Sequence, residues 1–206
     1  PHKQAAAGAV DRLTATAARL GVVNTVVATP DGLLGDSTDG AGFVDALRAE
    51  GADPAGRRAV VLGAGGAAAA VALALADAGA AQVGVAARRP DRAAAVAALA
   101  GAAGAVVDPA AVDGADLVVD ATSVGMQAGA GLPLALDPAR FGAGQVVVDL
   151  VYAPPVTPLL RAAAAAGAAT ANGLGMLVHQ AARQVRLFTG ADPPLDAMLA
   201  AVADRR

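Results

Sequence analysis

The chain has 206 residues, of which 56% are hydrophobic and 16% charged, and this composition excludes a disordered chain because so much apolar surface can offset the entropy of ordering. A net charge of −3 with 2% aromatic residues gives no sign of a nucleic-acid-binding surface. The sequence contains no cysteine, which excludes disulfide and thiolate chemistry and fits a reducing cytoplasm.

The first fifty or so residues are predicted to form helices around a β-hairpin. Residues 4–20 are predicted as one helix, because apolar side chains recur on one of its faces, and Gly21 is expected to end it. The other elements predicted here are strands at 22–28 and 33–36, a turn at 30–32 between them, and a helix from Thr38 to Gly51.

From residue 59 onward, short apolar strands alternate with helices. The predicted strands are 59–63, 82–87, 105–108, 116–122 and 145–151, and the predicted helices are 66–79, 90–100, 156–166, 173–187 and 195–203. Short apolar strands that alternate with helices indicate a parallel sheet covered on both faces, so the fold class is α/β with a doubly wound sheet. The charge-free stretch from Ala59 to Ala76 is interpreted as strand, turn and helix rather than as a membrane span, because glycines interrupt it.

The turn after the first of these strands reads Gly63-Ala64-Gly65-Gly66-Ala67-Ala68, which fits the dinucleotide-binding pattern G-x-G-x-x-A. The first glycine permits a tight turn, the second lets a pyrophosphate approach the backbone, and the small sixth residue lets helix and strand pack closely. The N-terminus of the helix offers free N–H groups to phosphate. Chance is the alternative in a chain rich in Gly and Ala, but the strand–turn–helix context favours dinucleotide binding.

The end of the second strand indicates which dinucleotide is bound. An acidic residue at this point would hold the ribose 2′-hydroxyl of NAD, but the strand ends in Arg88 and Arg89, with Arg92 one turn later. Guanidinium groups suit a phosphate and none of these residues would repel it, so NADP is favoured over NAD. The alternative is a basic turn in contact with solvent.

Lys3 and Asp39 are the candidates for chemistry. Lys3 is the only lysine among fifteen basic residues, and lysine can release a proton near neutral pH when its site shifts its pKa, whereas arginine cannot. Asp39 closes the stretch GDSTD, where the alternative is a helix N-terminus with Asp36, Ser37 or Thr38 as the cap. The two histidines are interpreted as structural, and no metal site is predicted.

Seven short stretches in this order and spacing resemble the shikimate dehydrogenase family over essentially the whole chain. They are PHK at 1–3, GVVNTV at 21–26, GDSTDGAGF at 35–43, GAGGAA at 63–68, ARR at 87–89, ATSVGM at 121–126 and NGLGMLVHQA at 172–181. The resemblance implies reduction of 3-dehydroshikimate to shikimate with NADPH, in a cytoplasmic enzyme of aromatic amino-acid biosynthesis.

The resemblance also assigns roles to residues. It implies a catalytic pair of Lys3 and Asp39, and substrate contacts from Asn24, Asp39, Gln180 and Tyr152. The implied cofactor-binding residues are Gly63, Ala64, Gly65, Gly66, Ala67, Arg88, Arg89, Arg92, Thr122, Val124, Met126, Gly173 and Met176. The implied division is a partial substrate domain at 1–41 and 174–206 and an NADP-binding, Rossmann-like domain at 42–173.

The sequence departs from the family pattern in three places. Ser37 replaces the usual Asn, and Ala87 replaces an Asn that contacts adenosine. The family also carries, before the PHK motif, a stretch that builds most of the substrate domain's sheet and includes a serine pair for the substrate carboxylate. The chain is therefore expected to be a fragment. If it starts at Pro1, Lys3 should be poorly anchored and the substrate half of the cleft open.

Three alternatives remain beside this interpretation. A quinate/shikimate dehydrogenase using NAD would share Lys3 and Asp39 but would usually carry an acidic residue in place of Arg88 and Arg89. A non-catalytic NADP-binding fragment would bind cofactor without turnover. A lysine-dependent folate dehydrogenase would not predict Asn24, Asp39 and Gln180 together. The expected partners are a small-molecule substrate and no nucleic acid or membrane, with the protein a monomer or homodimer.

Overall fold

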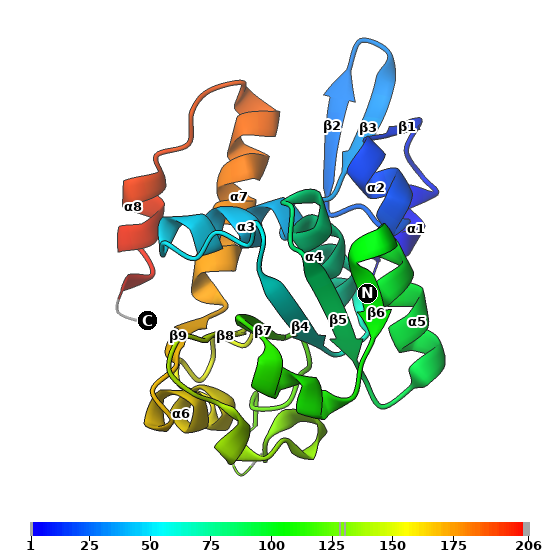
Figure 1. Ribbon diagram of the computed structural model, residues 1–206. Coiled ribbons are helices and arrows are strands. Elements are labelled where there is room, and N and C mark those ends of the chain that lie inside the picture. The colour runs from blue at the N-terminus through cyan, green and yellow to red at the C-terminus, as the bar shows by residue number, and fades with distance from the viewer. Residues whose placement is uncertain (1, 128, 130, 204–206) are drawn as a thin grey trace.

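Two β-sheets are joined by one helix, α3 (Asp39–Ala49), in the fold of this chain (Figure 1). The structure is a computed structural model that describes residues 2–127, 129 and 131–203. Pro1, the first residue of the PHK motif, lies outside the described residues.

The larger sheet has six parallel strands in the order β6-β5-β4-β7-β8-β9. Its strands are β4 (Arg58–Leu62), β5 (Gln82–Ala86), β6 (Gly104–Val106), β7 (Leu117–Asp120), β8 (Val146–Asp149) and β9 (Ala169–Asn172). Strands ordered in this way form the doubly wound dinucleotide-binding sheet, and the strand order reverses between β4 and β7. The predicted fold class is confirmed.

The inner strands β4, β5, β7 and β8 are buried on both faces, as expected for parallel strands, whereas the edge strands β6 and β9 are partly exposed. Ala59 and Val61 face one hydrophobic cluster while Val60 and Leu62 face the other. One face is covered by α3, α4 (Gly66–Asp77) and α5 (Pro90–Leu99). The other face is covered by α6 (Pro158–Ala165) and by the 3₁₀ segments Pro109–Gly114, Pro133–Ala135 and Pro138–Arg140.

The charge-free stretch from Ala59 to Ala76 forms β4, the glycine turn and most of α4, so its interpretation as strand, turn and helix is confirmed. Within the part of the chain that the structure describes, no helix has the length and hydropathy needed to cross a membrane.

The smaller sheet has the order β1-β3-β2 and projects from the rest of the molecule (Figure 1). Its strands are β1 (Arg12–Leu13), β2 (Thr25–Thr29) and β3 (Gly32–Asp36). The predicted hairpin is confirmed, since β2 and β3 pair antiparallel around a turn at Pro30 and Asp31. The first strand of the hairpin begins at Thr25, three residues later than predicted.

The prediction of one helix over residues 4–20 is wrong. The structure has α1 (Lys3–Ala7), then β1, then α2 (Ala15–Leu20). The break comes from pairing with β3, because the N–H of Asp11 donates to Leu33 O and the N–H of Thr14 donates to Gly35 O, both at 3.0 Å. The Thr14 hydroxyl then caps α2, which ends as predicted at Gly21, with φ of 65°.

Two glycines let α3 pack tightly between α4 and α7 (Leu174–Thr189). A Cβ on Gly40 would overlap Ala70 O in α4, and a Cβ on Gly42 would lie 2.5 Å from the backbone nitrogen of Gln180 in α7. Only glycine allows both approaches. The last helix, α8 (Leu195–Ala200), follows α7. This packing brings the start of α3 and the middle of α7 together.

Candidate active site

Lys3, Asp39 and Asn24 form one hydrogen-bonded cluster, although they come from three separate segments. Lys3 Nζ donates to Asp39 Oδ2, and Asn24 Nδ2 donates to Asp39 Oδ1 at 2.8 Å. The Lys3 side chain is half exposed whereas that of Asp39 is only 14% exposed, so the lysine lies at the solvent side of the cluster.

Lys3 is anchored through its backbone as well, contrary to the expectation of a poorly held residue. Its carbonyl accepts a hydrogen bond from the Val23 N–H at 2.9 Å, beside Asn24. Both ends of Lys3 are therefore tied to the segments that carry Asn24 and Asp39.

Thr38 fixes the orientation of Asn24. The Thr38 N–H donates to Asn24 Oδ1 at 3.0 Å, and Asn24 Nδ2 donates to the Thr38 hydroxyl at 3.1 Å. Thr38 is the N-cap residue of α3 and Asp39 lies in its first turn, as the alternative interpretation of GDSTD expects, but no side chain makes a capping hydrogen bond to this helix. Ser37, which replaces the family's Asn, is buried, and its hydroxyl has no hydrogen-bond partner among the described residues.

Gln180 reaches the same cluster from α7. Its Oε1 accepts from the Thr38 hydroxyl at 3.5 Å and from Gln184 Nε2 at 2.9 Å, while its Nε2 donates to Leu177 O at 2.9 Å. Sequence reasoning missed Gln184, which follows Gln180 by one helical turn. The i, i+4 spacing of two glutamines on one helix was the available signal.

The glycine turn has the form that a bound phosphate requires. No side chain caps the N-terminus of α4, and a Cβ on Gly65 or Gly66 would meet nothing within 4 Å. The N–H groups of the first helical turn are therefore accessible. Gly63 has φ of 110° and lies close to Ala121, so this residue has to be glycine.

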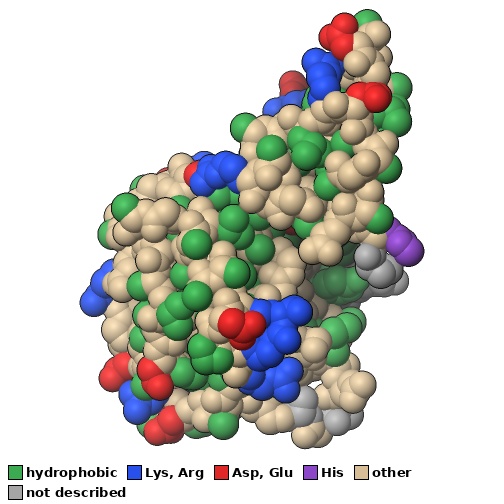
Figure 2. All heavy atoms as spheres, turned by 90° about the vertical axis from the view of Figure 1, so that its right-hand side faces the viewer, with side chains coloured by type: hydrophobic (Ala, Val, Ile, Leu, Met, Phe, Trp, Pro, Cys, Tyr) green, Lys and Arg blue, Asp and Glu red, His purple; other side chains and the backbone are tan. Residues whose placement is uncertain are grey.

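Arg88, Arg89 and Arg92 lie exposed at the end of β5 and the start of α5, the edge of the sheet that carries the glycine turn. Figure 2 shows the molecule hollowed below the projecting lobe, with a group of Lys and Arg side chains on the body beside the hollow. Guanidinium groups in this place can bind an anionic part of a ligand in the crevice.

The ATSVGM stretch forms a loop after β7. The Thr122 N–H donates to Asp120 Oδ1 at 2.8 Å, and the Thr122 hydroxyl accepts from the Val124 N–H at 3.1 Å. Met126 is exposed at the end of this loop. The predicted cofactor residues Thr122, Val124 and Met126 therefore follow the strand next to the glycine turn.

Tyr152, Gly173 and Met176 are not joined to the Lys3 cluster by any hydrogen bond among the described residues. Tyr152 is exposed on the loop between β8 and α6. A Cβ on Gly173 would overlap Leu150 O, so this glycine allows the start of α7 to approach the end of β8.

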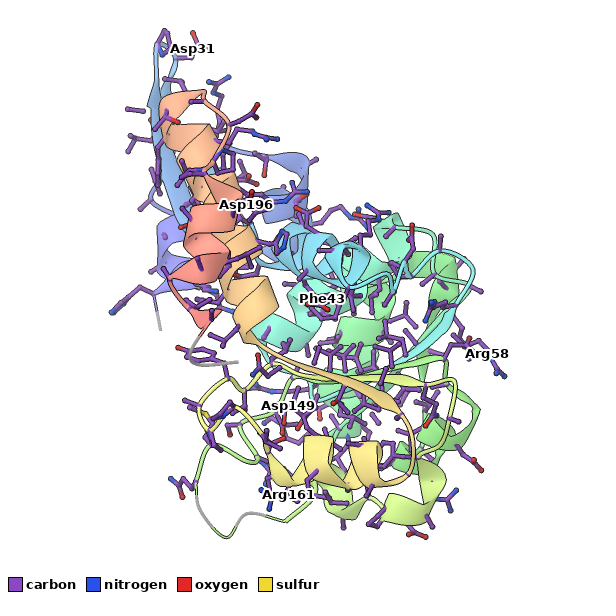
Figure 3. All side chains as sticks on the ribbon, turned by 90° about the vertical axis from the view of Figure 1, so that its left-hand side faces the viewer. Asp31, Phe43, Arg58, Asp149, Arg161 and Asp196 are labelled. Carbon is purple, nitrogen blue, oxygen red and sulfur yellow. The ribbon has the colours of Figure 1, made fainter. Side chains whose placement is uncertain are left out.

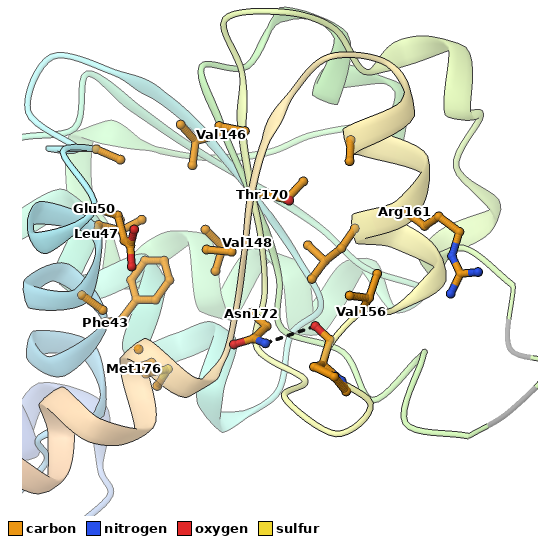
Figure 4. A pocket seen from close by; sticks show the side chains of 18 residues that line it. Phe43, Leu47, Glu50, Val146, Val148, Val156, Arg161, Thr170, Asn172 and Met176 are labelled. Atoms are coloured by element: carbon orange, nitrogen blue, oxygen red, sulfur yellow. Dashed lines mark hydrogen bonds between the residues drawn. The ribbon is translucent and has the colours of Figure 1, made fainter. Parts of the chain in front are cut away.

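A cavity of about 560 Å³ lies at the β9 edge of the large sheet, and none of the residues of the Lys3 cluster lines it (Figure 4). Phe43 and Leu47 of α3 line one side of it, and Val156 lies near α6 on the other. Met176 also lines this cavity.

Two buried carboxyl groups were not predicted. Asp120 and Asp149 end β7 and β8, and both are fully buried. Burial raises the pKa of Asp120 to about 7, with an opposing effect of the Thr122 N–H and a further rise from Asp149. Burial also raises the pKa of Asp149, against hydrogen bonds from Thr157 and Val151. The recurring pattern of three apolar residues and an aspartate, LVVD and VVVD, could have revealed the pair.

Known proteins match this chain along its length. Residues 173–203 match the family described as Shikimate 5′-dehydrogenase C-terminal domain. The shikimate dehydrogenase (NADP(+)) of Acidiphilium cryptum (strain JF-5) is 48% identical over 209 residues, covering 98% of this chain and 74% of that protein.

Solved structures share the fold. The shikimate 5-dehydrogenase of Thermus thermophilus, in complex with NADP(H) and shikimate, is 40% identical with a TM-score of 0.90, covering 100% of this chain and 77% of that one. The ligand-free 5-ketofructose reductase of Gluconobacter sp. strain CHM43 is 34% identical with a TM-score of 0.87, and the match covers 99% of this chain and 76% of that one.

A dinucleotide-binding sheet packed against α3, whose Asp39 is paired with Lys3 of α1, defines the class of protein as an oxidoreductase that uses a nicotinamide cofactor. Sequence identity with the Acidiphilium protein then identifies the family within this class, because the identity extends over nearly the whole chain. The chain belongs to the shikimate dehydrogenase family, and it spans about 74% of the length of the Acidiphilium relative.

Proposed function

We propose that this chain carries out the reaction of an NADP-dependent shikimate dehydrogenase, the reduction of 3-dehydroshikimate to shikimate. The observation that carries the proposal is the cluster in which Asp39 accepts from Lys3 with one oxygen and from Asn24 with the other. A cation held by an oriented carboxylate, half open to solvent, suits proton donation to a developing alkoxide.

The residues present fit NADPH. The uncapped start of α4 and the open space over Gly65 and Gly66 would accept the pyrophosphate, and Arg88, Arg89 and Arg92 would hold the 2′-phosphate. When bound, NADPH supplies the hydride that reduces the ketone carbon. Ala64 and Ala67 of the turn, Thr122, Val124 and Met126 of the next loop, and Gly173 and Met176 complete the proposed cofactor-binding set.

Lys3 and Asp39 divide the acid–base work in this proposal. The Lys3 ammonium donates a proton to the carbonyl oxygen as negative charge develops on it. Asp39 orients the ammonium, and Asn24 keeps Asp39 from rotating because it occupies the second carboxylate oxygen. The same side chain of Asp39 would accept from a substrate hydroxyl next to the reacting carbon.

Asn24, Gln180 and Tyr152 are the proposed contacts to substrate hydroxyl groups. Asn24 and Gln180 both form a hydrogen bond with the Thr38 hydroxyl, and each can donate and accept hydrogen bonds. Tyr152 would approach from the loop between β8 and α6.

The proposal includes a division of the chain. Residues 1–41 and 174–206 form a partial substrate domain, and residues 42–173 form the NADP-binding domain. The location of the small sheet within 12–36 and of the six-stranded sheet within 58–172 supports this division. We further propose a cytoplasmic enzyme that is a monomer or a homodimer.

The deciding experiment is an assay of shikimate oxidation with NADP⁺, using quinate and NAD⁺ as comparators, on the longest polypeptide that the gene encodes. We expect turnover of shikimate with NADP⁺ to exceed that of either comparator pairing. Binding of NADPH without any shikimate oxidation would instead identify a non-catalytic NADP-binding protein, and faster turnover of quinate with NAD⁺ would identify the quinate enzyme.

A further inference from the structure

Two buried carboxyl groups lie side by side outside the proposed mechanism. Asp120 ends β7 and Asp149 ends β8, and the strand register pairs them directly. Both residues are 0% exposed, and Figure 3 shows Asp149 in the interior between the large sheet and α6. Two carboxylates next to each other in a dry interior repel, so such a pair retains one proton.

The hydrogen bonds show which member carries the charge. Asp149 is surrounded by donors, since its Oδ1 accepts from the Val151 N–H at 2.9 Å and its Oδ2 accepts from the Thr157 hydroxyl at 2.6 Å. In the Asp120 carboxyl group, Oδ1 accepts from the Thr122 N–H at 2.8 Å, and Oδ2 has no partner among the described residues. An ionised carboxylate needs donors at both oxygens, which Asp149 has and Asp120 lacks. The proton therefore belongs on Asp120.

Each carboxyl group holds one loop. Asp120 binds the first residues of the 121–126 loop, and Asp149 binds both ends of the 150–157 loop. The two loops also touch, because a Cβ on Gly125 would lie 3.2 Å from Thr157 Cβ. The 121–126 loop reaches the glycine turn on its other side, where a Cβ on Gly63 would lie 3.2 Å from the Ala121 carbonyl.

Among the described residues, Asp149 of β8 is the charged neighbour that acts on Asp120. From β4 the register partner of Asp120 is the apolar Leu62, and the neutral hydroxyl of Thr157, just before α6, donates to Asp149. A change in the ionisation of Asp120 therefore acts on Asp149 and on the two loops, with no cation among these neighbours to compensate for it.

We propose that Asp120 and Asp149 are an electrostatically coupled pair of positioning residues, which retains one proton between its two carboxyl groups and holds the 121–126 and 150–157 loops at the edge of the cofactor site. The proton is on Asp120 and the negative charge on Asp149. Loss of the proton places a second negative charge one strand away from the glycine turn, where it repels the phosphates of the cofactor and drives the two strand ends apart. The part of this inference that concerns the cofactor rests on the proposed function.

The pair itself is tested without any ligand, by ¹³C NMR of the aspartate carboxyl carbons across pH. We expect one carboxyl carbon of the wild-type chain to titrate above about pH 6, far from the ordinary range of aspartate, and to be missing from the spectrum of Asp120→Asn. Titration of every aspartate carboxyl in the wild-type chain below about pH 5 would overturn the proposal. The wild-type result alone decides this point if the variant does not fold.

The effect on the cofactor is tested by the dissociation constant of NADPH, followed by its fluorescence. Asn at position 120 mimics the protonated acid, so we expect the wild-type to Asp120→Asn ratio of dissociation constants to rise at least about threefold between about pH 6 and about pH 8.5. Using the ratio cancels the titration of the cofactor's own phosphate. A ratio that stays constant over this range contradicts the positioning role.

Asp113→Asn is the matched control. This residue is exposed, lies in the 3₁₀ segment Pro109–Gly114 between β6 and β7, and loses the same charge when substituted. We expect the ratio of the NADPH dissociation constants of the wild type and Asp113→Asn to stay constant across pH. Failure of every variant to bind NADPH at any pH would count against the proposed function, whereas the carboxyl titration would still decide whether the pair retains one proton.

Discussion

Lys3 is held in place by two hydrogen bonds. Its carbonyl accepts from the Val23 N–H, and its ammonium donates to Asp39. A frayed terminal lysine would have neither contact. Both contacts come from segments that follow Lys3 in the chain, so folding is what brings the lysine and its carboxylate partner together.

For Lys3→Ala we expect kcat to fall about 10²-fold or more, because a general acid is lost, while the dissociation constant of NADPH stays the same. Steady-state kinetics and a fluorescence titration measure the two quantities. Lys3→Arg keeps the charge but cannot release a proton near neutral pH, so substantial rescue by this variant would show that electrostatics alone is needed. A near-normal kcat in Lys3→Ala would remove Lys3 from the mechanism.

Gln184 is expected to position Gln180, because it donates to the oxygen of that side chain. Gln184→Met keeps the size of the side chain but removes the donor. We expect the KM for shikimate to rise about tenfold with little change in kcat, the effect of one lost hydrogen bond. Leu187→Met, an exposed change on the same helix, serves as control. A fall in kcat by the same factor as the expected rise in KM would point to a role in the chemical step instead.

At the scale of elements, α3 determines how the site is assembled. Its first residue is Asp39, and its glycines at 40 and 42 let it approach α4 and α7 more closely than any side chain would allow. The stretch DGAGF therefore combines a functional carboxylate with the backbone contacts that bring Gln180 beside it.

Gly42→Ala tests this packing. The added Cβ would lie 2.5 Å from the backbone nitrogen of Gln180, so the two helices must separate. We expect the free energy of unfolding to fall by about 1–3 kcal/mol and the KM for shikimate to rise. Denaturant unfolding and kinetics measure both. Gly8→Ala, where the nearest atom is 3.6 Å away, should change stability by less than about 0.5 kcal/mol. Equal effects of the two variants would contradict the packing argument.

Local patterns predicted β4, β5, β6, β7 and β8 because each of these strands is a short apolar run, whereas β9, with Thr170 and Asn172, is more polar. They failed at residues 4–20, where helical periodicity is present but hydrogen bonds to Leu33 and Gly35 override it. This strand pairing joins residues about twenty positions apart, so the periodicity of a short window of sequence gives no sign of it. The roles of Lys3 and Asn24 came from family resemblance, since no spacing rule connects them to Asp39.

At the scale of the whole molecule, ion pairs contribute little to holding the two sheets together. Arg19 of α2 donates to both oxygens of Asp77 in α4, at 2.9 Å each, but the two side chains are about half exposed. Such a pair contributes at most about 1 kcal/mol. The buried contacts of α3 are therefore the main connection between the sheets.

The buried Asp120 makes stability depend on pH. Its folded pKa is about 7 against an ordinary 3.8, so the folded state binds the proton more tightly, and the stability from this group is lost as pH rises from 3.8 through 7. Between about pH 5 and about pH 7, the free energy of unfolding should fall less steeply with pH in Asp120→Asn than in the wild type. The difference between the two slopes should be about 1.4 kcal/mol per pH unit. Urea unfolding at these pH values measures the slopes. Equal slopes in wild type and variant would show that Asp120 does not retain its proton.

The chain has one tyrosine and no tryptophan, and that tyrosine, Tyr152, is exposed on the loop between β8 and α6. The intrinsic ultraviolet fluorescence of the protein therefore comes almost entirely from a single position, which is one of the proposed substrate contacts. Its emission and quenching report the state of the 150–157 loop in the unmodified protein, so ordering of this loop by substrate could be followed in real time without attaching a dye.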